Sequence, residues 1–419
     1  MTLKKVLASV LALSMVAAVP TYVGAADEAV ELTLWGAEED RELLAELVEG
    51  FKAAYPDVTF DIQLGVESES TAKDTVLTDI EAAADVYAFA SDQIYDLVNA
   101  GALAKLDDYN EAFEAVAGKS LDDVKAANSA GSVAAATVND GLYAFPMSGD
   151  NSYFLYYDST IVSAEDATNW DALLAAAEAG GKKVGMTLAS GWYNAGFFYG
   201  AGFTTDLNDD GTTAIDWNGT SAAGYTGVDV VKSMLGIAGH PAFQAIADGD
   251  ISNQIASGGL CAVVSGTWDA QAAQEAFGDG YAAVKLPTYT LGEDQIQMGS
   301  AFGYKFVGVN AYAENIGWAA VLAEYLTNEE AQVARFAARE IGPTNLVAAE
   351  DEAVKANIAI SAVVEQSEFG VLQRVGGKYW DPTSTFGEMI AQGELSADDE
   401  AGIQAALDTL VEGVTAPVE

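Results

Sequence analysis

The chain has 419 residues, of which 50% are hydrophobic and 10% aromatic. This length exceeds that of most single domains, so we expect two domains with substantial apolar cores. Lys+Arg 18 against Asp+Glu 63 give a formal net charge of -45, which repels nucleic acids and anionic membranes and excludes both as partners.

The N-terminal stretch MTLKKVLASVLALSMVAAVPTYVGAADEAV has the pattern of a secretory signal. Lys4 and Lys5 precede a short apolar run, and small residues surround Ala25. We expect a signal peptide over residues 1–26 and an exported protein, located in the extracellular space, at the cell surface or in the periplasm. The one cysteine, Cys261, is far from the cleavage point, which argues against lipid attachment there. Its apolar surroundings, GGLCAVVSGTW, predict a buried strand.

The first elements predict an α/β fold. AVELTLW alternates as a strand does, and Leu44, Leu47, Val48 and Phe51 then recur at helical spacing until Pro56. VTFDIQL alternates again. ADVYAFA, residues 84–90, reads as a strand buried on both faces, followed by a helix that ends at Gly101. Ligands of open α/β sheets bind at the carboxyl ends of such strands.

Extended links around Pro146, Pro287 and Pro343 are candidate passages of the chain between two lobes. We therefore expect residues 27–147 and 288–342 to form an N-terminal lobe. Residues 148–287 and 343–419 would form a C-terminal lobe.

Chemical motifs are few. The one histidine, His240, lies beside a proline turn, which argues against a Ser/His/Asp triad. There is no phosphate-binding glycine loop with a lysine, and no Cys/His metal cluster, so we expect no cofactor and no metal. DLNDDGTTAIDW begins like a calcium loop at Asp206, but Trp217 stands where a glutamate should close it, so we interpret it as a hairpin turn. Paired carboxylates for glycoside hydrolysis are not excluded among so many acids.

The stretch SGWYNAGFFYGAGF, residues 190–203, divides into two parts. Phe197, Phe198 and Tyr199 have spacings that a helix buries, whereas Trp192 and Tyr193 are expected to be exposed at a helix start. Trp268 and Trp380 also stand at the ends of predicted elements. Because tryptophans are usually buried, three at such positions indicate a surface for stacking on a sugar, with acids to bind its hydroxyls.

Several segments together resemble the extracellular solute-binding proteins of ATP-binding-cassette sugar importers, in their maltose/maltodextrin-binding branch. They are LTLWGAEEDRELLAELVEGFKAAYPDV, ADVYAFASDQIYDLVNAGAL, GLYAFPMSGDNSYFLYYD, VVSGTWDAQAAQ, KLPTY, LAEYLTNEEAQ and YWDPTSTFG. The resemblance covers nearly the whole mature chain in order.

This resemblance implies an α/β, two-lobed fold of the maltose-binding-protein type, with a hinge and a central ligand cleft. It implies a non-enzymatic, monomeric protein that binds malto-oligosaccharides (maltose, maltotriose, maltodextrin) by closure and delivers them to membrane permease subunits. The ligand-binding residues that it implies are Glu38, Glu39, Asp40, Phe89, Asp92, Asp150, Trp192, Tyr193, Trp268 and Trp380. Gln93 departs from the family, since an enteric relative has a ligand-binding arginine there.

Other functions stay open at this point. A different oligosaccharide, such as a xylo- or fructo-oligosaccharide, would suit the same aromatic rings and acids. A secreted glycoside hydrolase would release shortened sugar, and an adhesin would bind insoluble polymer.

Overall fold

The computed structural model describes residues 29–208 and 211–417, and these divide into two compact units. The first unit contains residues up to Gly149 together with Tyr304–Lys355, and the second contains Asp150–Gly303 and the residues from Ala356 on. The signal peptide predicted over residues 1–26 lies outside the described part of the chain.

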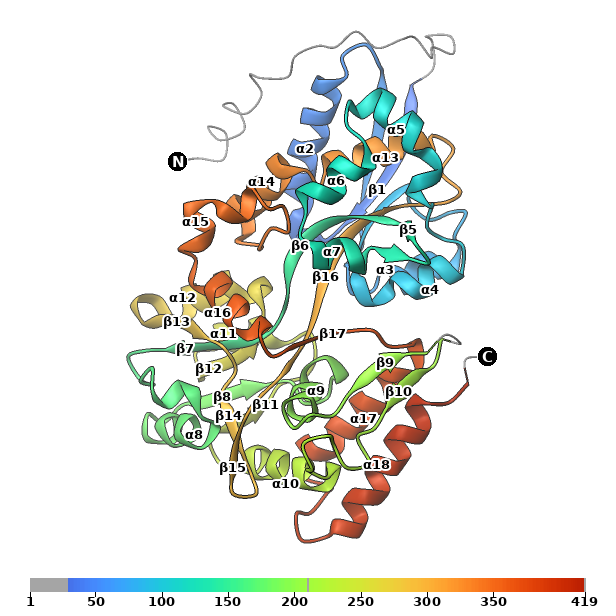
Figure 1. Ribbon diagram of the computed structural model, residues 1–419. Helices are drawn as coiled ribbons and strands as arrows, with labels where there is room; N and C mark the ends of the chain where they lie inside the picture. The colour runs from blue at the N-terminus through green and yellow to red at the C-terminus, as the bar shows by residue number, and fades with distance from the viewer. Residues whose placement is uncertain (1–28, 209–210, 418–419) are drawn as a thin grey trace. The chain divides into compact units, whose positions relative to one another are not determined.

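The first unit is built on a mixed sheet with the strand order β16-β3-β1-β2. β6 pairs with β16, and these two strands lie side by side in Figure 1. β1 pairs in parallel with both β2 and β3, whereas β3 is antiparallel to β16. The strands are β1 (Val30–Gly36), β2 (Phe60–Val66), β3 (Val86–Ala90), β6 (Ala144–Ser152) and β16 (Ser300–Val309), beside a small hairpin of β4 (Thr137–Val138) and β5 (Gly141–Leu142).

The helices of the first unit follow from apolar spacing in the sequence. α2 (Arg41–Ala54) buries Leu44, Leu47 and Phe51, so the predicted strand, helix and strand at the start of the fold are confirmed. The ring of Phe51 lies 6.4 Å from that of Trp318 in α13, which places both helices over one face of the sheet. The other helices are α3 (Ala72–Thr78), α4 (Ile94–Asn99), α5 (Asn110–Ala117), α6 (Leu121–Ala127), α7 (Ala130–Ala135), α13 (Ile316–Tyr325), α14 (Glu329–Arg339) and α15 (Glu352–Lys355).

The second unit is built on a five-stranded sheet with the order β11-β8-β12-β7-β13. The predicted strand around Cys261 is β12, and Cys261 is fully buried in it. The strands are β7 (Phe154–Asp158), β8 (Lys183–Met186), β11 (Phe243–Ala245), β12 (Leu260–Ser265) and β13 (Tyr281–Val284), beside β17 (Gly370–Leu372), which pairs with the first residues of β16, and a hairpin of β14 (Thr288–Leu291) and β15 (Asp294–Gln297).

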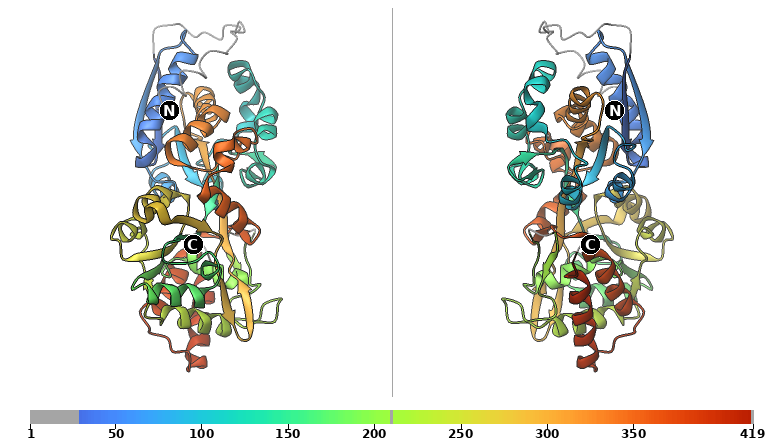
Figure 2. Two further views of the ribbon diagram at one scale, coloured as in Figure 1. Left: turned by 90° about the vertical axis from the view of Figure 1, so that its left-hand side faces the viewer. Right: turned by 90° about the vertical axis from the view of Figure 1, so that its right-hand side faces the viewer.

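Helices α17 and α18 of the second unit run side by side (Figure 2). α17 also packs on α9, and α18 packs on α10. The helices of this unit are α8 (Trp170–Ala179), α9 (Gly191–Gly200), α10 (Gly227–Ala238), α11 (Ile251–Ala256), α12 (Ala270–Phe277), α16 (Ile358–Ser367), α17 (Trp380–Ala391) and α18 (Glu400–Val414).

The DLNDDG stretch forms the expected hairpin. β9 (Thr205–Leu207) pairs antiparallel with β10 (Thr213–Ile215), and Gly211 has a φ of 81°, which glycine adopts readily. Residues 209 and 210 of the calcium-like loop lie outside the described ranges. Trp217 is fully buried and stacks on Phe198 with the ring centroids 4.2 Å apart, so this residue belongs to the core.

The chain changes unit at residues 149–150, 303–304 and 355–356. The first passage lies close to the expected link at Pro146, whereas the other two come after Pro287 and Pro343. Residues 288–303 belong to the second unit because the hydroxyl of Tyr289 donates to the carbonyl of Phe197 at 2.5 Å, beneath α9. Residues 343–355 belong to the first unit, where the amide N–H of Thr344 donates to Gln332 of α14.

Candidate ligand-binding site

Two of the three singled-out tryptophans lie at the starts of neighbouring helices in the second unit. Trp192 is the second residue of α9 and Trp380 is the first of α17, and both are half-buried. The hydroxyl of Tyr379 joins the two helix starts by donating to the carbonyl of Gly191 at 2.9 Å. A Cβ atom on Gly191 would come within 2.2 Å of Thr383 Oγ1, so only glycine permits this close approach.

The third tryptophan, Trp268, lies in the turn Thr267–Asp269 that follows β12 and is connected to the same region. Its ring lies over Gly266, where a Cβ atom would come within 2.2 Å of the indole. Trp268 and Ser265 both lie near the hydroxyl of Tyr193, where they lower its pKa against the larger effect of burial. The ring of Tyr153 lies 6.0 Å from that of Trp192 and 5.0 Å from that of Tyr193. The structure thus links Trp192, Trp268 and Trp380 through one set of contacts, and we call these three residues the tryptophan cluster.

Tyr193 is 4% exposed, which corrects the expectation that it is exposed beside Trp192. The reason is that its ring packs against Tyr153 while its hydroxyl faces inward, toward Ser265 and Trp268. Burial raises the pKa of Tyr193 far above its ordinary value, and nearby carboxylates add to this effect. Tyr193 is therefore a core residue that lies beside Trp268.

The predicted core residues of α9 are core residues. Phe197 and Phe198 are fully buried and Tyr199 is 7% exposed. The remaining tryptophans of the second unit, Trp170 and Trp217, are also fully buried, so exposure separates the tryptophan cluster from the core. A half-exposed indole offers a flat apolar face to a ligand, which a buried one does not.

Two carboxylates lie near Trp268 in the structure and accept hydrogen bonds from hydroxyl groups. Asp150 is buried, and the hydroxyl of Thr267 donates to its Oδ2 at 2.6 Å. Asp269, which the sequence reasoning did not single out, accepts hydrogen bonds from Ser252 and Ser265. Because a charged acceptor binds a hydroxyl about twice as strongly as a neutral one, such groups suit a polyhydroxylated ligand.

The acids at the end of β1, in the first unit, differ sharply in exposure. They form a single turn, Glu38–Asp40, that leads into α2. Glu38 and Glu39 are exposed, and Glu38 is 3.4 Å from Arg41. Asp40 is 2% exposed, which places it in the interior of this unit rather than on its surface.

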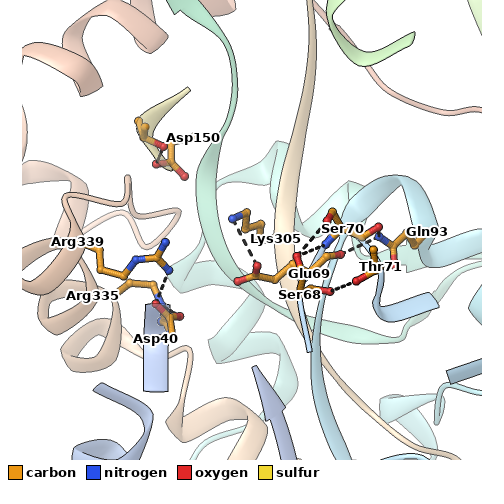
Figure 3. A network of polar contacts seen from close by, with 11 residues as sticks. Asp40, Ser68, Glu69, Ser70, Thr71, Gln93, Asp150, Lys305, Arg335 and Arg339 are labelled. Carbon is orange, nitrogen blue, oxygen red and sulfur yellow. Dashed lines mark hydrogen bonds and ion pairs between the residues drawn. The ribbon is translucent and has the colours of Figure 1, made fainter. Parts of the chain in front are cut away.

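Asp40 is the anchor of a buried ion cluster (Figure 3). Its two carboxylate oxygens contact the guanidinium groups of Arg335 at 3.1 Å and Arg339 at 2.5 Å, both from α14. Burial alone would raise the pKa of Asp40, but the two arginines outweigh burial and lower it to about 2. Asp40 therefore ties the end of β1 to α14, a role that its place in the sequence did not indicate.

The residues at the end of β3 and in the turn that follows it also divide between core and surface. Phe89 is fully buried, with its ring 5.8 Å from that of Phe306, so in this structure it packs in the core. Asp92 is partly exposed in the turn after β3. Burial raises the pKa of its carboxyl to about 6, although Lys73 opposes the effect.

Gln93, the residue that departs from the family, forms hydrogen bonds with the backbone of a neighbouring turn. Its side-chain amide donates to the carbonyls of Glu69 and Ser70 at 2.7 and 3.0 Å, and its side-chain oxygen accepts from the amide of Lys73 (Figure 3). The turn that it holds brings Glu69 within 3.8 Å of Lys305, and both of these side chains are largely buried. Sequence reasoning missed this pair because its members are distant in the chain.

The sequence and the fold are similar to those of known proteins. Residues 46–362 match the sequence profile of a family described as bacterial extracellular solute-binding protein, and this range is more than half of the chain. The chain belongs to this family.

A solved structure of a complex with acarbose is 27% identical to this solute-binding protein and has a TM-score of 0.78, covering 92% of this chain and 99% of that one. The maltodextrin binding protein MalE1 from L. casei BL23, solved without ligand, is 22% identical with a TM-score of 0.76, covering 93% and 100%. These likenesses confirm the expected two-lobed fold of the maltose-binding-protein type.

A curated relative, the galactooligosaccharide-binding protein of Bacillus subtilis (strain 168), is 30% identical over 156 residues. The match covers 36% of this chain and 35% of the relative, so it spans about a third of either protein.

Within residues 29–208 and 211–417, no three His, Cys, Asp or Glu side chains are grouped as metal ligands would be. None of the helices in this part of the chain is both long and apolar enough to cross a membrane.

Proposed function

We propose that this solute-binding protein binds malto-oligosaccharides such as maltose, maltotriose and maltodextrin, and delivers them intact to the membrane permease subunits of an ATP-binding-cassette importer. The observation that carries the proposal is the tryptophan cluster. Three half-exposed indoles from three separate segments share one network of contacts in the second unit, and two carboxylates lie near one of them, Trp268.

The chemistry of the cluster suits a sugar. An indole ring stacks on the apolar C–H face of a hexose, and carboxylates accept hydrogen bonds from its hydroxyls. Glu38, Glu39 and Asp92 of the first unit would add acceptors as the protein closes over the ligand. Closure would be driven by the contacts that the ligand makes better in the closed state. The three buried residues of the predicted set would not touch the sugar but would position the residues that do. They are Asp40, Phe89 and Tyr193.

The structural likeness to maltodextrin-binding and acarbose-bound proteins favours α-glucans, while the partial match to a galactooligosaccharide-binding protein makes that sugar class the main competitor. Isothermal titration with maltotriose, xylotriose, a fructo-oligosaccharide and a galacto-oligosaccharide separates these classes. Chromatography of the recovered sugar separates carriage from hydrolysis.

Maltotriose should bind saturably and be recovered uncut. Trp268→Ala should weaken it by roughly thirtyfold, which corresponds to about 2 kcal/mol for a central aromatic contact. Tyr312→Ala, which removes an aromatic ring that is 55% exposed in the first unit, is the matched control and should leave affinity unchanged. If the titration shows binding heat with another sugar and none with maltotriose, the proposed substrate is overturned. If the recovered sugar has been shortened, the proposed transport role is overturned.

A further inference from the structure

Another partly exposed tryptophan, Trp35, lies in the first unit, on the face of β1 opposite α2. Leu32 and Leu34 of β1 point into the core, whereas Thr33 is exposed and Trp35 is half-buried. Next to Trp35 is a shallow, open hollow of about 430 Å³. It is lined by Trp35, Asp74, Thr75, Thr78, Asp79, Ala82 and Ala83, and we call it the Trp35 hollow.

The position of the Trp35 ring depends on a glycine of the neighbouring strand. Trp35 pairs with Gly65 of β2, and a Cβ atom on Gly65 would lie 2.5 Å from Trp35 Cδ1 and 2.7 Å from Nε1. The bare glycine therefore lets the indole lie down across β2 instead of standing away from the sheet. No contact within the described residues occupies the indole N–H, which stays a donor without a partner.

The other lining groups combine acceptors with hydroxyls. Asp79 uses one oxygen to accept the amide of Ala82 at 3.2 Å, which leaves its second oxygen for a ligand. The Thr78 hydroxyl donates to the carbonyl of Asp74 at 3.0 Å and keeps its lone pairs. The hydroxyl of Thr75 has no partner among the described residues. A ligand that both donates and accepts hydrogen bonds uses all of these groups.

An indole beside carboxylates suits two classes of ligand. One is an organic cation and the other is a sugar. A quaternary ammonium would use the ring face and the negative charge, but it has no acceptor for the indole N–H or the Thr75 hydroxyl. A hexose stacks its C–H face on the ring, donates hydroxyls to Asp79 and accepts from Trp35 and Thr75. The mixture of donors and acceptors therefore favours the neutral sugar.

We propose that the Trp35 hollow is a second carbohydrate site, which takes one or two hexose units of a neutral oligosaccharide. It goes beyond the function proposed above, because its residues belong to the first unit alone and none of them is in the tryptophan cluster. Such a site would retain longer glycan chains at the surface of the protein. With one aromatic ring in a shallow, largely exposed hollow, its affinity should be weak, with a dissociation constant on the order of 1 mM.

Fluorine NMR on protein labelled with 5-fluorotryptophan tests the proposal, because the chain has seven tryptophans and each gives its own signal. Trp35→Phe identifies the Trp35 signal by its loss. Titration with maltotriose, xylotriose and a linear galactotriose should shift that signal at millimolar concentration for at least one sugar. The shift should persist in Trp268→Ala and vanish in the double variant Thr75→Ala, Asp79→Asn, which retains the ring. Leu64→Ala, a change at an exposed side chain of β2 outside the hollow, should leave it unchanged.

Three results would overturn the proposal. One is a Trp35 signal that stays still at about ten times the expected dissociation constant of every sugar. The second is a signal that moves only in step with those of the tryptophan cluster, which would be a remote effect of one site. The third is a response to choline and to no sugar. Failure of the function proposed above would instead be seen in the signals of Trp192, Trp268 and Trp380, so the two failures are distinguishable.

Discussion

The buried ion cluster around Asp40 offers a test that separates a structural residue from a ligand-binding one. Asp40→Asn keeps the size of the side chain but removes its charge, and it leaves Arg335, which is 2% exposed, without a full counter-ion. Removing one partner of a buried ion pair typically costs about 3–5 kcal/mol.

The pKa of Asp40 gives a second value for the magnitude. A folded-state pKa of about 2, against 3.8 for the free side chain, corresponds to about 2 kcal/mol of stability at pH 7. Because the folded-state pKa is lowered, this stability is present above pH 4 and is lost as the pH falls toward 2. At pH 3 about half of it should remain. We therefore expect Asp40→Asn to lower the free energy of unfolding by about 3 kcal/mol at pH 7, and by clearly less at pH 3.

Urea unfolding followed by circular dichroism at both pH values measures these differences. Glu49→Gln, which removes one member of an exposed pair with Lys52, is the control and should unfold like the wild type. The reasoning is refuted if Asp40→Asn unfolds like the wild type at pH 7 and yet loses sugar binding. That outcome would place Asp40 on the ligand instead of on α14.

Three further predictions concern single residues. Asp92→Asn should stabilise the protein more at pH 7.5 than at pH 5, measured by urea unfolding, because a raised carboxyl pKa means that stability is lost as the pH rises through about 6; equal effects at both pH values would contradict this. Gly387→Ala should lower the melting temperature by several degrees in calorimetry, since its Cβ atom would come within 1.8 Å of the Leu188 carbonyl oxygen; unchanged melting would show that α17 can shift freely. The thiol of Cys261 should react with a thiol reagent only after unfolding, because it is fully buried and burial raises its pKa to about 11; rapid reaction of the native protein would mean that β12 opens.

Local patterns in the sequence predicted local structure well. The spacing of Leu44, Leu47 and Phe51 defined the buried face of α2, and the apolar run at residues 84–90 identified β3, which is buried along its whole length. Position at an element start was a weaker guide to the exposure of the tryptophans, although Trp192, Trp268 and Trp380 are half-buried as expected. Trp170 is also the first residue of a helix, directly after Asn169, and yet it is fully buried.

Contacts between distant segments were beyond such patterns. Nothing near Asp40 indicates a pairing with Arg335, which lies 295 residues further along the chain. The same holds for Glu69 and Lys305. Phe89 follows the register of a buried strand, so its contact with Phe306 depends on β16 joining the sheet next to β3. Sheet partners chosen from the far end of the chain decide these contacts, and hydrophobic periodicity carries no information about them.

The three passages of the chain between its units also bear on how the protein is made and handled. Neither unit is a continuous segment, because β16, α13 and α14 of the first unit come after most of the second unit in the sequence. A chain emerging from an export channel therefore cannot complete its first sheet until about three quarters of it has crossed, and the early strands must wait with an open edge. An expression fragment that ends at Gly149 would retain β1 on one side of β3 but lack β16 on the other. A cut in the exposed loop around Gly292, within the second unit, would leave both sheets with all of their strands.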